Sequence, residues 1–247
     1  MNKVIDRLMR NPATFEFLSL FAYAIYCAIF AVAALPPALL ISRGMGFLDG
    51  SILMLFVFVL FCALAFYVFL VSAAVFVGFV ERLITLGIKP GCYELGSPVF
   101  LRWLIYAGLH LWLVNIVLPF IRGNNWIKIY LRIAGAKVGK QTFVNTSHIY
   151  DTYLLEIADH VVVGGEAFLN CHLYENGLLN LGKIVLGEGT TIGGKAYLTP
   201  GTTTGKNSTV GIHTYLRRNT KVGDGDALIT PPGASIRQVV KAMRGAK

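Results

Sequence analysis

Residues 169–177 of this 247-residue chain, LNCHLYENG, bring together side chains that can do acid–base or nucleophilic chemistry. His172 carries an imidazole that titrates near neutral pH, so it can take a proton from an amine or a hydroxyl as a general base. Cys171 can attack a carbonyl carbon as a thiolate. The chemistry of this stretch therefore depends on which side chain the fold turns toward a ligand.

The spacing of Cys171 and His172 favours the histidine. Successive residues of a β-strand point to opposite faces, so these two side chains are not expected to form a dyad within one chain. A free cysteine behaves as a small apolar side chain and suits an interior position. We therefore expect Cys171 to face inward and His172 outward, and a surface histidine without a catalytic role is the alternative.

A six-residue repeat surrounds this stretch and predicts the fold. Eight consecutive hexads begin at Leu186, Ile192, Leu198, Thr204, Val210, Leu216, Val222 and Leu228. The first position is aliphatic in seven of them, the second is glycine in five, and the fifth is threonine, serine or alanine in six. This pattern is typical of a left-handed parallel β-helix, a mainly β fold in which three hexads make one triangular coil. A β-sandwich would need longer strands with period-two alternation.

The repeat is interrupted close to the candidate histidine. Hexads run in step from Ile157 to Leu169, and the next begins at Leu186, 17 residues after Leu169. Eleven residues, 175–185, stand in this gap, which predicts that a loop leaves the prism after LNCHLY. Loops that a rigid scaffold displays are common places for function.

A metal site is a weaker interpretation of the histidines. His148, His160 and His172 are spaced by 12 residues, which is two corners of the prism rather than one full coil. They are therefore not expected to stack on one edge. The four cysteines form no CxxC pair, so neither a zinc site nor a disulfide framework is indicated. We expect no metal.

Two long uncharged stretches predict a transmembrane helical hairpin near the N-terminus. Only 14% of the residues are charged, and none of these lies in 18–42 or 51–80. Each stretch exceeds the roughly 20 apolar residues that cross a bilayer. The first contains Pro36 and Pro37, where a helix should end or kink. Basic residues flank both ends of the hairpin, which places those ends and the following domain in the cytoplasm.

A third apolar run, residues 99–121, contains Arg102, His110, Asn115 and Pro119, which are costly or disruptive in hydrocarbon. Five basic residues and no acid follow in 122–140, and they would lie outside if the run crossed. A re-entrant or interfacial run is therefore favoured.

The next segment reads as an amphipathic helix. Lys128 and Arg132 share one face, whereas Trp126, Ile129 and Ile133 share another. This pattern fits a helix in the membrane surface or one packed on the next domain.

These patterns divide the chain into four parts. A transmembrane hairpin with its flanking loops occupies 1–97, and an interfacial or re-entrant helical segment occupies 98–136. The β-helix domain follows at 137–233, and a cationic helix at 234–247 is expected to cap its open end. The formal charge is +9, but no basic stripe alternates with aromatic residues, so nucleic acid is not expected as a partner.

Three segments within 121–211 give the chain a specific resemblance. They read IRGNNWIKIYLRIAGAKVGK, DTYLLEIAD and NCHLYENGLLNLGKIVLGEGTTIGGKAYLTPGTTTGKNSTVG. Their order resembles the membrane-associated hexapeptide acyltransferases. In particular, the chain is similar to a single unit of the terminal membrane region of poly-lysine-synthetase-type nonribosomal peptide synthetases.

The resemblance implies direct acyl transfer from a thioester to an amine or hydroxyl, without an acyl-enzyme. The family pattern around its histidine is like QTHLFEDR followed by an aliphatic stretch and LG, and CHLYEN followed by Leu181 and Gly182 matches it. It implies that His172 is the base and that Glu175 is a partner for the imidazole or for an acceptor amine. The family's acidic stretch matches Asp151, as a substrate contact or as a structural corner.

Further residues complete the expected site. Asn170 and Tyr174 are expected to contact substrate, and backbone N–H groups at Gly193 to stabilise an oxyanion. The candidates for binding the substrate or the donor phosphates are Lys195, Lys206, Arg217 and Arg218, and the alternative for each is a solvated charge. Many relatives end their solenoid in a GNPA-like loop, but this chain has GDALITPPGAS, so the donor is either acyl-CoA or a carrier-protein thioester.

The same resemblance implies a homotrimer, because β-helix acyltransferases usually place active sites between adjacent prisms. The apolarity of 98–133 suggests a lipid-linked acceptor. Two other functions stay open: a non-catalytic scaffold anchored in the lipid bilayer, and a metal-dependent β-helix lyase or anhydrase.

Overall fold

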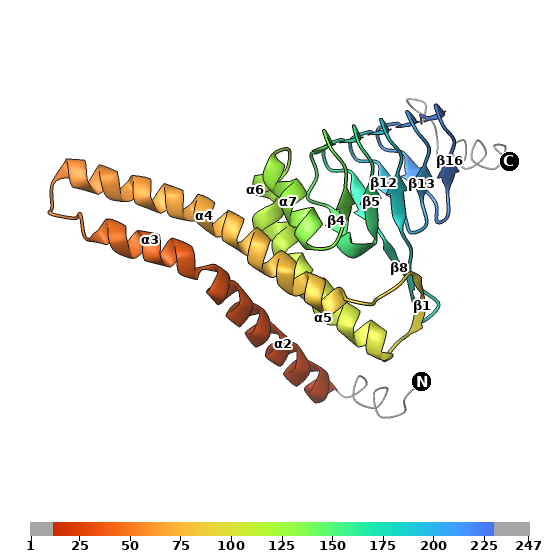
Figure 1. Ribbon diagram of the computed structural model, residues 1–247. Coiled ribbons are helices and arrows are strands. Elements are labelled where there is room, and N and C mark those ends of the chain that lie inside the picture. The colour runs from red at the N-terminus through yellow and green to blue at the C-terminus, as the bar shows by residue number, and fades with distance from the viewer. Residues whose placement is uncertain (1–11, 230–247) are drawn as a thin grey trace.

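The structure, a computed structural model, describes residues 12–229 (Figure 1). A ladder of short strands forms one end of the molecule, and long helices project from it. The cationic helix expected at 234–247 lies outside the described residues. The helices and the strand ladder meet along one face, and that junction is where the candidate site lies.

The first helices are apolar and mostly uncovered. Helix α2 (Pro12–Ala33) and helix α3 (Leu35–Met45) meet at a bend of 51°. Pro36 and Pro37 lie in the first turn of α3, where a missing N–H costs no helical hydrogen bond, so the predicted kink is confirmed. Helix α4 (Ile52–Thr85) runs back along α3 and, at 34 residues, is about 51 Å long.

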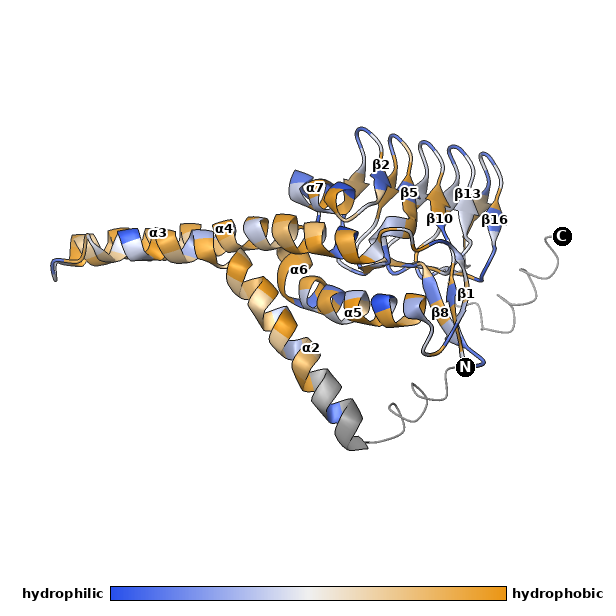
Figure 2. Ribbon diagram, turned by 60° about the horizontal axis from the view of Figure 1, so that its bottom comes forward, coloured by the Kyte–Doolittle hydropathy of each residue, from blue (hydrophilic) through white to orange (hydrophobic). Residues whose placement is uncertain are grey.

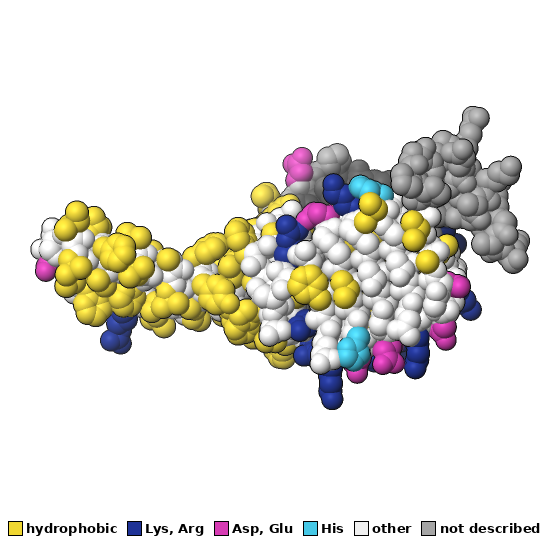
Figure 3. Space-filling view, turned by 90° about the horizontal axis from the view of Figure 1, so that it is seen from above, with side chains coloured by type: hydrophobic (Ala, Val, Ile, Leu, Met, Phe, Trp, Pro, Cys, Tyr) yellow, Lys and Arg dark blue, Asp and Glu magenta, His cyan; other side chains and the backbone are white. Residues whose placement is uncertain are grey.

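Two helices are long and apolar enough to cross a membrane, α4 and the helix over Pro98–Ile121. The bent pair α2 and α3 would count as a third if the two helices form one span. Hydrophobic side chains cover the surface of the projecting arm (Figures 2 and 3). This is the exposure expected of helices that contact lipid rather than water.

The third apolar run forms one helix with a local irregularity. It consists of α5 (Pro98–Trp112), a π-helical turn η1 (Leu113–Val117) and α6 (Leu118–Ile121). Pro119 has no N–H to donate to the preceding turn, and the π turn accommodates that loss. A window of this helix is 44% buried inside the structure, because one face packs on α4 and on the strand ladder.

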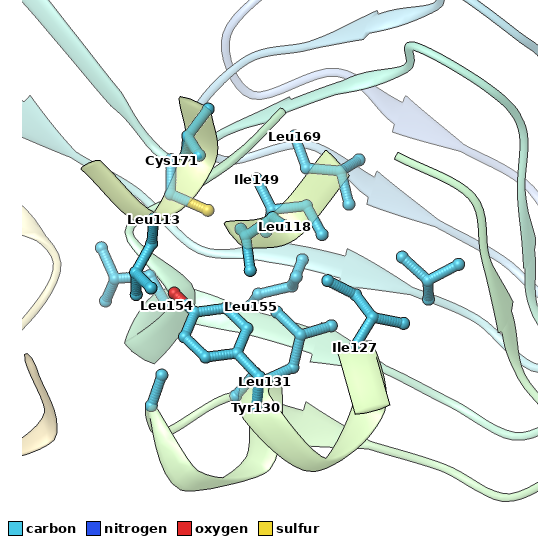
Figure 4. Close-up of a cluster of buried hydrophobic side chains, with 14 of the residues drawn as sticks. Leu113, Leu118, Ile127, Tyr130, Leu131, Ile149, Leu154, Leu155, Leu169 and Cys171 are labelled. Atoms are coloured by element: carbon cyan, nitrogen blue, oxygen red, sulfur yellow. The ribbon is translucent and has the colours of Figure 1, made fainter. Parts of the chain in front are cut away.

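Helix α7 (Asn125–Ile133) is packed between α4 and the β-helix. The side chain of Asn124 caps it by accepting the N–H of Trp126 at 2.8 Å. Its buried residues are Ile127, Tyr130 and Leu131, which lie beside aliphatic residues of the first strands (Figure 4). The predicted amphipathic helix is confirmed, but its buried face differs from the Trp126, Ile129 and Ile133 face, since Ile129 is exposed.

Three parallel sheets build the predicted β-helix, which is confirmed. The first sheet contains β2 (Lys137–Val138), β5 (Leu155–Ile157), β10 (Ile184–Leu186), β13 (Thr203–Thr204) and β16 (Lys221–Val222). The second contains β3 (Phe143–Val144), β6 (Val162–Val163), β11 (Thr191–Ile192), β14 (Thr209–Val210) and β17 (Ala227–Leu228). The third contains β4 (Ile149–Tyr150), β7 (Phe168–Asn170), β12 (Tyr197–Leu198) and β15 (Tyr215–Leu216). Aliphatic residues stack inside, as where Leu198 pairs with Leu169 and Leu216.

A β-hairpin interrupts the prism at the edge between the third and first sheets. It consists of β8 (His172–Glu175) and β9 (Leu178–Leu181). The expected excursion at 175–185 therefore begins three residues earlier, at His172. The reason is that the inserted residues sit in a single corner, which the N–H of Gly182 closes by donating to the carbonyl of Cys171.

A third strand joins this hairpin from the membrane part of the chain. Strand β1 (Gly91–Glu94), between α4 and α5, pairs antiparallel with β9 to give the order β1-β9-β8. The hairpin and the segment between the two helices thus form one small sheet.

Candidate active site

His172 is the first residue of β8 and stands where the hairpin leaves the prism. Its Nδ1 atom lies 2.6 Å from Oδ2 of Asp151, and a quarter of its side chain is exposed. An ionised carboxylate only accepts hydrogen bonds, so Nδ1 carries the hydrogen and donates it. The other ring nitrogen, Nε2, is then the one that can take a proton from a substrate.

Asp151 is held in an unusual backbone conformation directly after β4. Its φ and ψ are 58° and 54°, in the left-handed region, and it precedes a short 3-10 helix, η2 (Thr152–Leu154). Aspartate tolerates this region better than most residues that carry a Cβ atom. The turn points the carboxylate into the protein, where only 1% of the side chain is exposed.

Both oxygens of the buried carboxylate have partners. Oδ2 accepts the hydrogen bond from His172, and Oδ1 accepts one at 2.7 Å from the indole Nε1–H of Trp103 on α5. A buried charge needs such partners, because an unpaired one is very costly. Trp103 also packs edge-on to the imidazole, with ring centroids 5.0 Å apart. Asp151 and Trp103 together fix the orientation of His172.

His172 and Asp151 line a cavity of about 220 Å³ between α5 and the β-helix. Helix α5 supplies five of its residues, and the remaining three come from the end of β4 and the start of β8. The lining residues are Trp103, Tyr106, Ala107, His110, Leu111, Tyr150, Asp151 and His172. The arrangement thus offers a partly buried base, an apolar wall and room for a small group.

A buried polar cluster beneath the cavity fixes α5 to its neighbours. His110 Nδ1 lies 2.9 Å from Glu81 Oε1 on α4, and the Tyr130 hydroxyl on α7 donates to Glu81 Oε2 at 2.9 Å. His110 Nε2 lies 2.6 Å from the carbonyl oxygen of Ile149 on β4. Burial and the nearby Glu81 raise the pKa of Tyr130 well above its ordinary value, so the hydroxyl remains a donor. This cluster holds three helices and a strand in one arrangement.

Cys171 faces the interior of the prism, as predicted (Figure 4). Its side chain is fully buried. Burial, with a smaller contribution from the Asp151 charge, raises the pKa of the thiol well above its ordinary value. A nucleophilic cysteine needs a thiolate, so the position does not suit a covalent role.

Glu175 does not contact the imidazole, and the expectation that it would is corrected. It is exposed at the end of β8, and its Oε2 lies 3.3 Å from Nη1 of Arg218. Residues an odd number apart on a strand point to opposite faces, so Glu175 and His172 diverge. Asp151 takes the role instead, and its buried hydrogen bond decides between the two interpretations that the sequence leaves for it.

The other expected substrate residues divide into near and distant ones. Asn170 lies close to His172, is nearly buried and donates from Nδ2 to the Tyr197 hydroxyl at 3.1 Å. Tyr174 lies on the exposed part of β8. Gly193 is on another edge, between the second and third sheets, and its N–H already donates to the carbonyl of Val210 at 2.7 Å. Its expected role as an oxyanion donor is therefore corrected.

The expected donor-binding cations are spread over three edges of the prism. Arg217 and Arg218 are exposed on the edge that carries His172. Lys195 lies on the edge of Gly193, and Lys206 lies on the third edge, 3.4 Å from Glu188. Within one chain they do not converge on the base.

The histidines do not gather around a metal. Among residues 12–229, no group of three His, Cys, Asp or Glu side chains is arranged to hold a metal ion. His148 instead pairs with Glu166 at 2.9 Å and stacks on Phe168.

Comparison with known proteins gives one informative relative. No family model matches the chain. The delta-poly-L-ornithine synthetase of Acinetobacter baumannii is 29% identical to it over 165 residues, which is 65% of this chain. The chain resembles a unit of a poly-amino-acid synthetase. The resemblance inferred from the sequence motifs is confirmed, although the chain spans only 12% of the length of that relative.

Solved structures with partial similarity are acetyltransferases. A maltose O-acetyltransferase from Clostridium difficile 630 is 18% identical and overlaps with a TM-score of 0.46, covering 62% of this chain and 93% of its own. A galactoside acetyltransferase in complex with coenzyme A is 16% identical with a TM-score of 0.43, covering 67% and 93%.

Proposed function

We propose that the protein is an acyltransferase that moves an acyl or aminoacyl group from a thioester directly to an amine or a hydroxyl. The observation that carries the proposal is the His172–Asp151 pair at 2.6 Å, turned toward a cavity. A histidine oriented by a buried carboxylate is the arrangement that general-base catalysis requires. A scaffold without catalysis gives no reason for this pair and cavity.

The reaction balances with His172 as base. Nε2 takes the proton from the acceptor, whose nitrogen or oxygen attacks the acyl carbon of the thioester. The new C–N or C–O bond forms, the C–S bond breaks, and the leaving thiolate recovers the proton from the imidazolium. Asp151 stabilises that imidazolium through Nδ1, and buried Cys171 takes no part.

The relative supports an amine as one acceptor. Its name describes the synthesis of a polymer of ornithine, and joining amino acids requires acyl transfer to an amine. The donor is acyl-CoA or a carrier-protein thioester. Arg217 and Arg218 support this assignment, because they are exposed on the edge that carries His172 and can bind phosphate.

We further propose that the protein is integral to the cell membrane, with the β-helix on the cytoplasmic side and α7 near the membrane surface. The exposed apolar surface of α3 and α4 supports the first statement. A homotrimer would bring the cation-bearing edge of a neighbouring prism beside His172, which supplies what one chain lacks. Mass measurement in detergent that gives only monomer would contradict the trimer.

The decisive experiment compares His172→Asn with His160→Asn. His160 is an exposed histidine on another edge, and asparagine tolerates its positive φ of 59°. Thiol release from acetyl-CoA is measured with amine and alcohol acceptors. We expect His172→Asn to lose about 10²- to 10⁴-fold in kcat and the control to match wild type. Full activity in a folded His172→Asn protein would overturn the proposal.

A further inference from the structure

We infer that the cavity beside His172 is the acceptor subsite, and that the acceptor is an amine or hydroxyl at the end of an apolar stem that enters from the bilayer along α5. The inference rests on the proposed function and names the substrate class of that site. It follows from the lining of the cavity, its size and the surface onto which it opens.

The lining suits an uncharged nucleophile and excludes a phosphate-bearing donor. Among the described residues that line the cavity, none is a lysine or an arginine. Asp151 and His110 already have hydrogen-bond partners at both polar atoms of their side chains. Coenzyme A or a carrier arm would place phosphate and amide groups against aromatic rings without partners, which is costly. The group that reaches His172 through this cavity is therefore the acceptor.

The size of the cavity limits what it holds. Its volume of about 220 Å³ corresponds to about seven water-sized groups, each occupying about 30 Å³. That is room for an amino or hydroxyl head and a few methylene groups. The rest of a longer acceptor must lie outside, against the surface at the mouth.

That surface is the apolar face of a candidate membrane span. Leu111 lines the cavity and is 50% exposed, so it stands at the mouth. Leu104, two helical turns earlier on the same face of α5, is also exposed. Arg102, the charged residue of α5, is turned away, because its guanidinium donates to the carbonyls of Ile84 and Leu86. An apolar stem can therefore extend from the cavity into lipid without meeting a charge.

Such an acceptor gains affinity with stem length until the stem leaves the protein. Each methylene buried against the cavity wall should improve binding about fourfold. Short soluble amines and alcohols would fill the cavity but would not use the face at Leu111.

The test uses the full chain in one detergent, with acetyl-CoA as donor and butylamine, octylamine and octanol as acceptors. Leu111→Trp narrows the mouth. Ile105→Trp is the matched control, because Ile105 is 45% exposed on another face of α5 and does not line the cavity. Detergent partition of each acceptor is the same for both variants, so it cancels in their ratio.

We expect Leu111→Trp to lower kcat/KM for octylamine and octanol about tenfold, while the KM for acetyl-CoA is unchanged. The Ile105→Trp protein should stay within about twofold of wild type. Binding of octylamine, measured by calorimetry without donor, should weaken in the same order.

The outcomes separate the two proposals. Transfer to octylamine that both variants support equally would overturn the acceptor subsite and leave the acyltransferase intact. Octylamine binding that Leu111→Trp weakens, with no transfer to any acceptor, would support the subsite and overturn the proposed function. A protein that neither binds nor acylates these acceptors would contradict both.

Discussion

Replacing Asp151 by Asn tests how the carboxylate orients His172. Asparagine keeps the size of the side chain and tolerates the left-handed φ of 58°, so the turn after β4 should survive. Trp103 determines how the amide settles, because its N–H needs an acceptor at the position of Oδ1. The amide oxygen must therefore face Trp103, and the amide NH₂ must face His172.

That orientation converts the base into the wrong tautomer. The amide donates to Nδ1, so Nε2 keeps the hydrogen and cannot take a proton. Loss of the charge-assisted hydrogen bond alone costs about 2–3 kcal/mol, which is about 30- to 160-fold in rate. With the tautomer also wrong, we expect kcat to fall about 10⁴-fold.

The double variant Asp151→Asn with Trp103→Phe gives a sharper test. Without the indole N–H the amide is free to turn, and its oxygen can accept from Nδ1–H. We expect the double variant to be about tenfold more active than Asp151→Asn alone, a non-additive result. The assay is steady-state thiol release, with thermal unfolding in detergent to verify folding. A double variant less active than the single one, or an Asp151→Asn protein near wild-type activity, would refute the reasoning.

Other variants have smaller and distinct effects. Trp103→Phe alone should lower kcat about three- to tenfold, because it removes one hydrogen bond from a carboxylate that remains charged, and stopped assays at saturating donor would detect it. Cys171→Ala should retain activity and lower stability by about 1 kcal/mol in denaturant melts, and the native thiol should resist maleimide until the protein unfolds, because burial raises its pKa. Glu166→Gln should flatten the acid side of the stability curve. Arg122 lowers the pKa of Glu166 below its ordinary 4.5, so the wild-type ion pair stabilises the fold above that pH and is lost as the pH falls through the folded-state pKa.

The fold was predictable because its information is local and repeated. Each hexad states which residue faces inward, so Leu169, Leu198 and Leu216 could be placed on one stack from spacing alone. The opposite orientations of Cys171 and His172 followed from the same alternation. The hairpin was harder to place, because an insertion in a corner leaves no periodic signal for where it starts.

The partners of His172 could not be read from the sequence. Asp151 and Trp103 are brought together by packing between a helix and a strand 48 residues apart. A tryptophan in an apolar run is common in membrane helices, so Trp103 carried no distinguishing signal. Strand β1 was missed for a similar reason, since its partner β9 lies almost 90 residues away and four residues are too few to show a pattern.

The indole of Trp103 makes the chemistry answer to the thickness of the bilayer. Helix α5 belongs to a candidate span, and helices tilt when their apolar length and the hydrocarbon layer do not match. A tilt of α5 would shift the indole away from Asp151 and loosen the imidazole. We therefore expect turnover in liposomes to peak at one acyl-chain length of the host lipid, so that the membrane itself selects where the enzyme works.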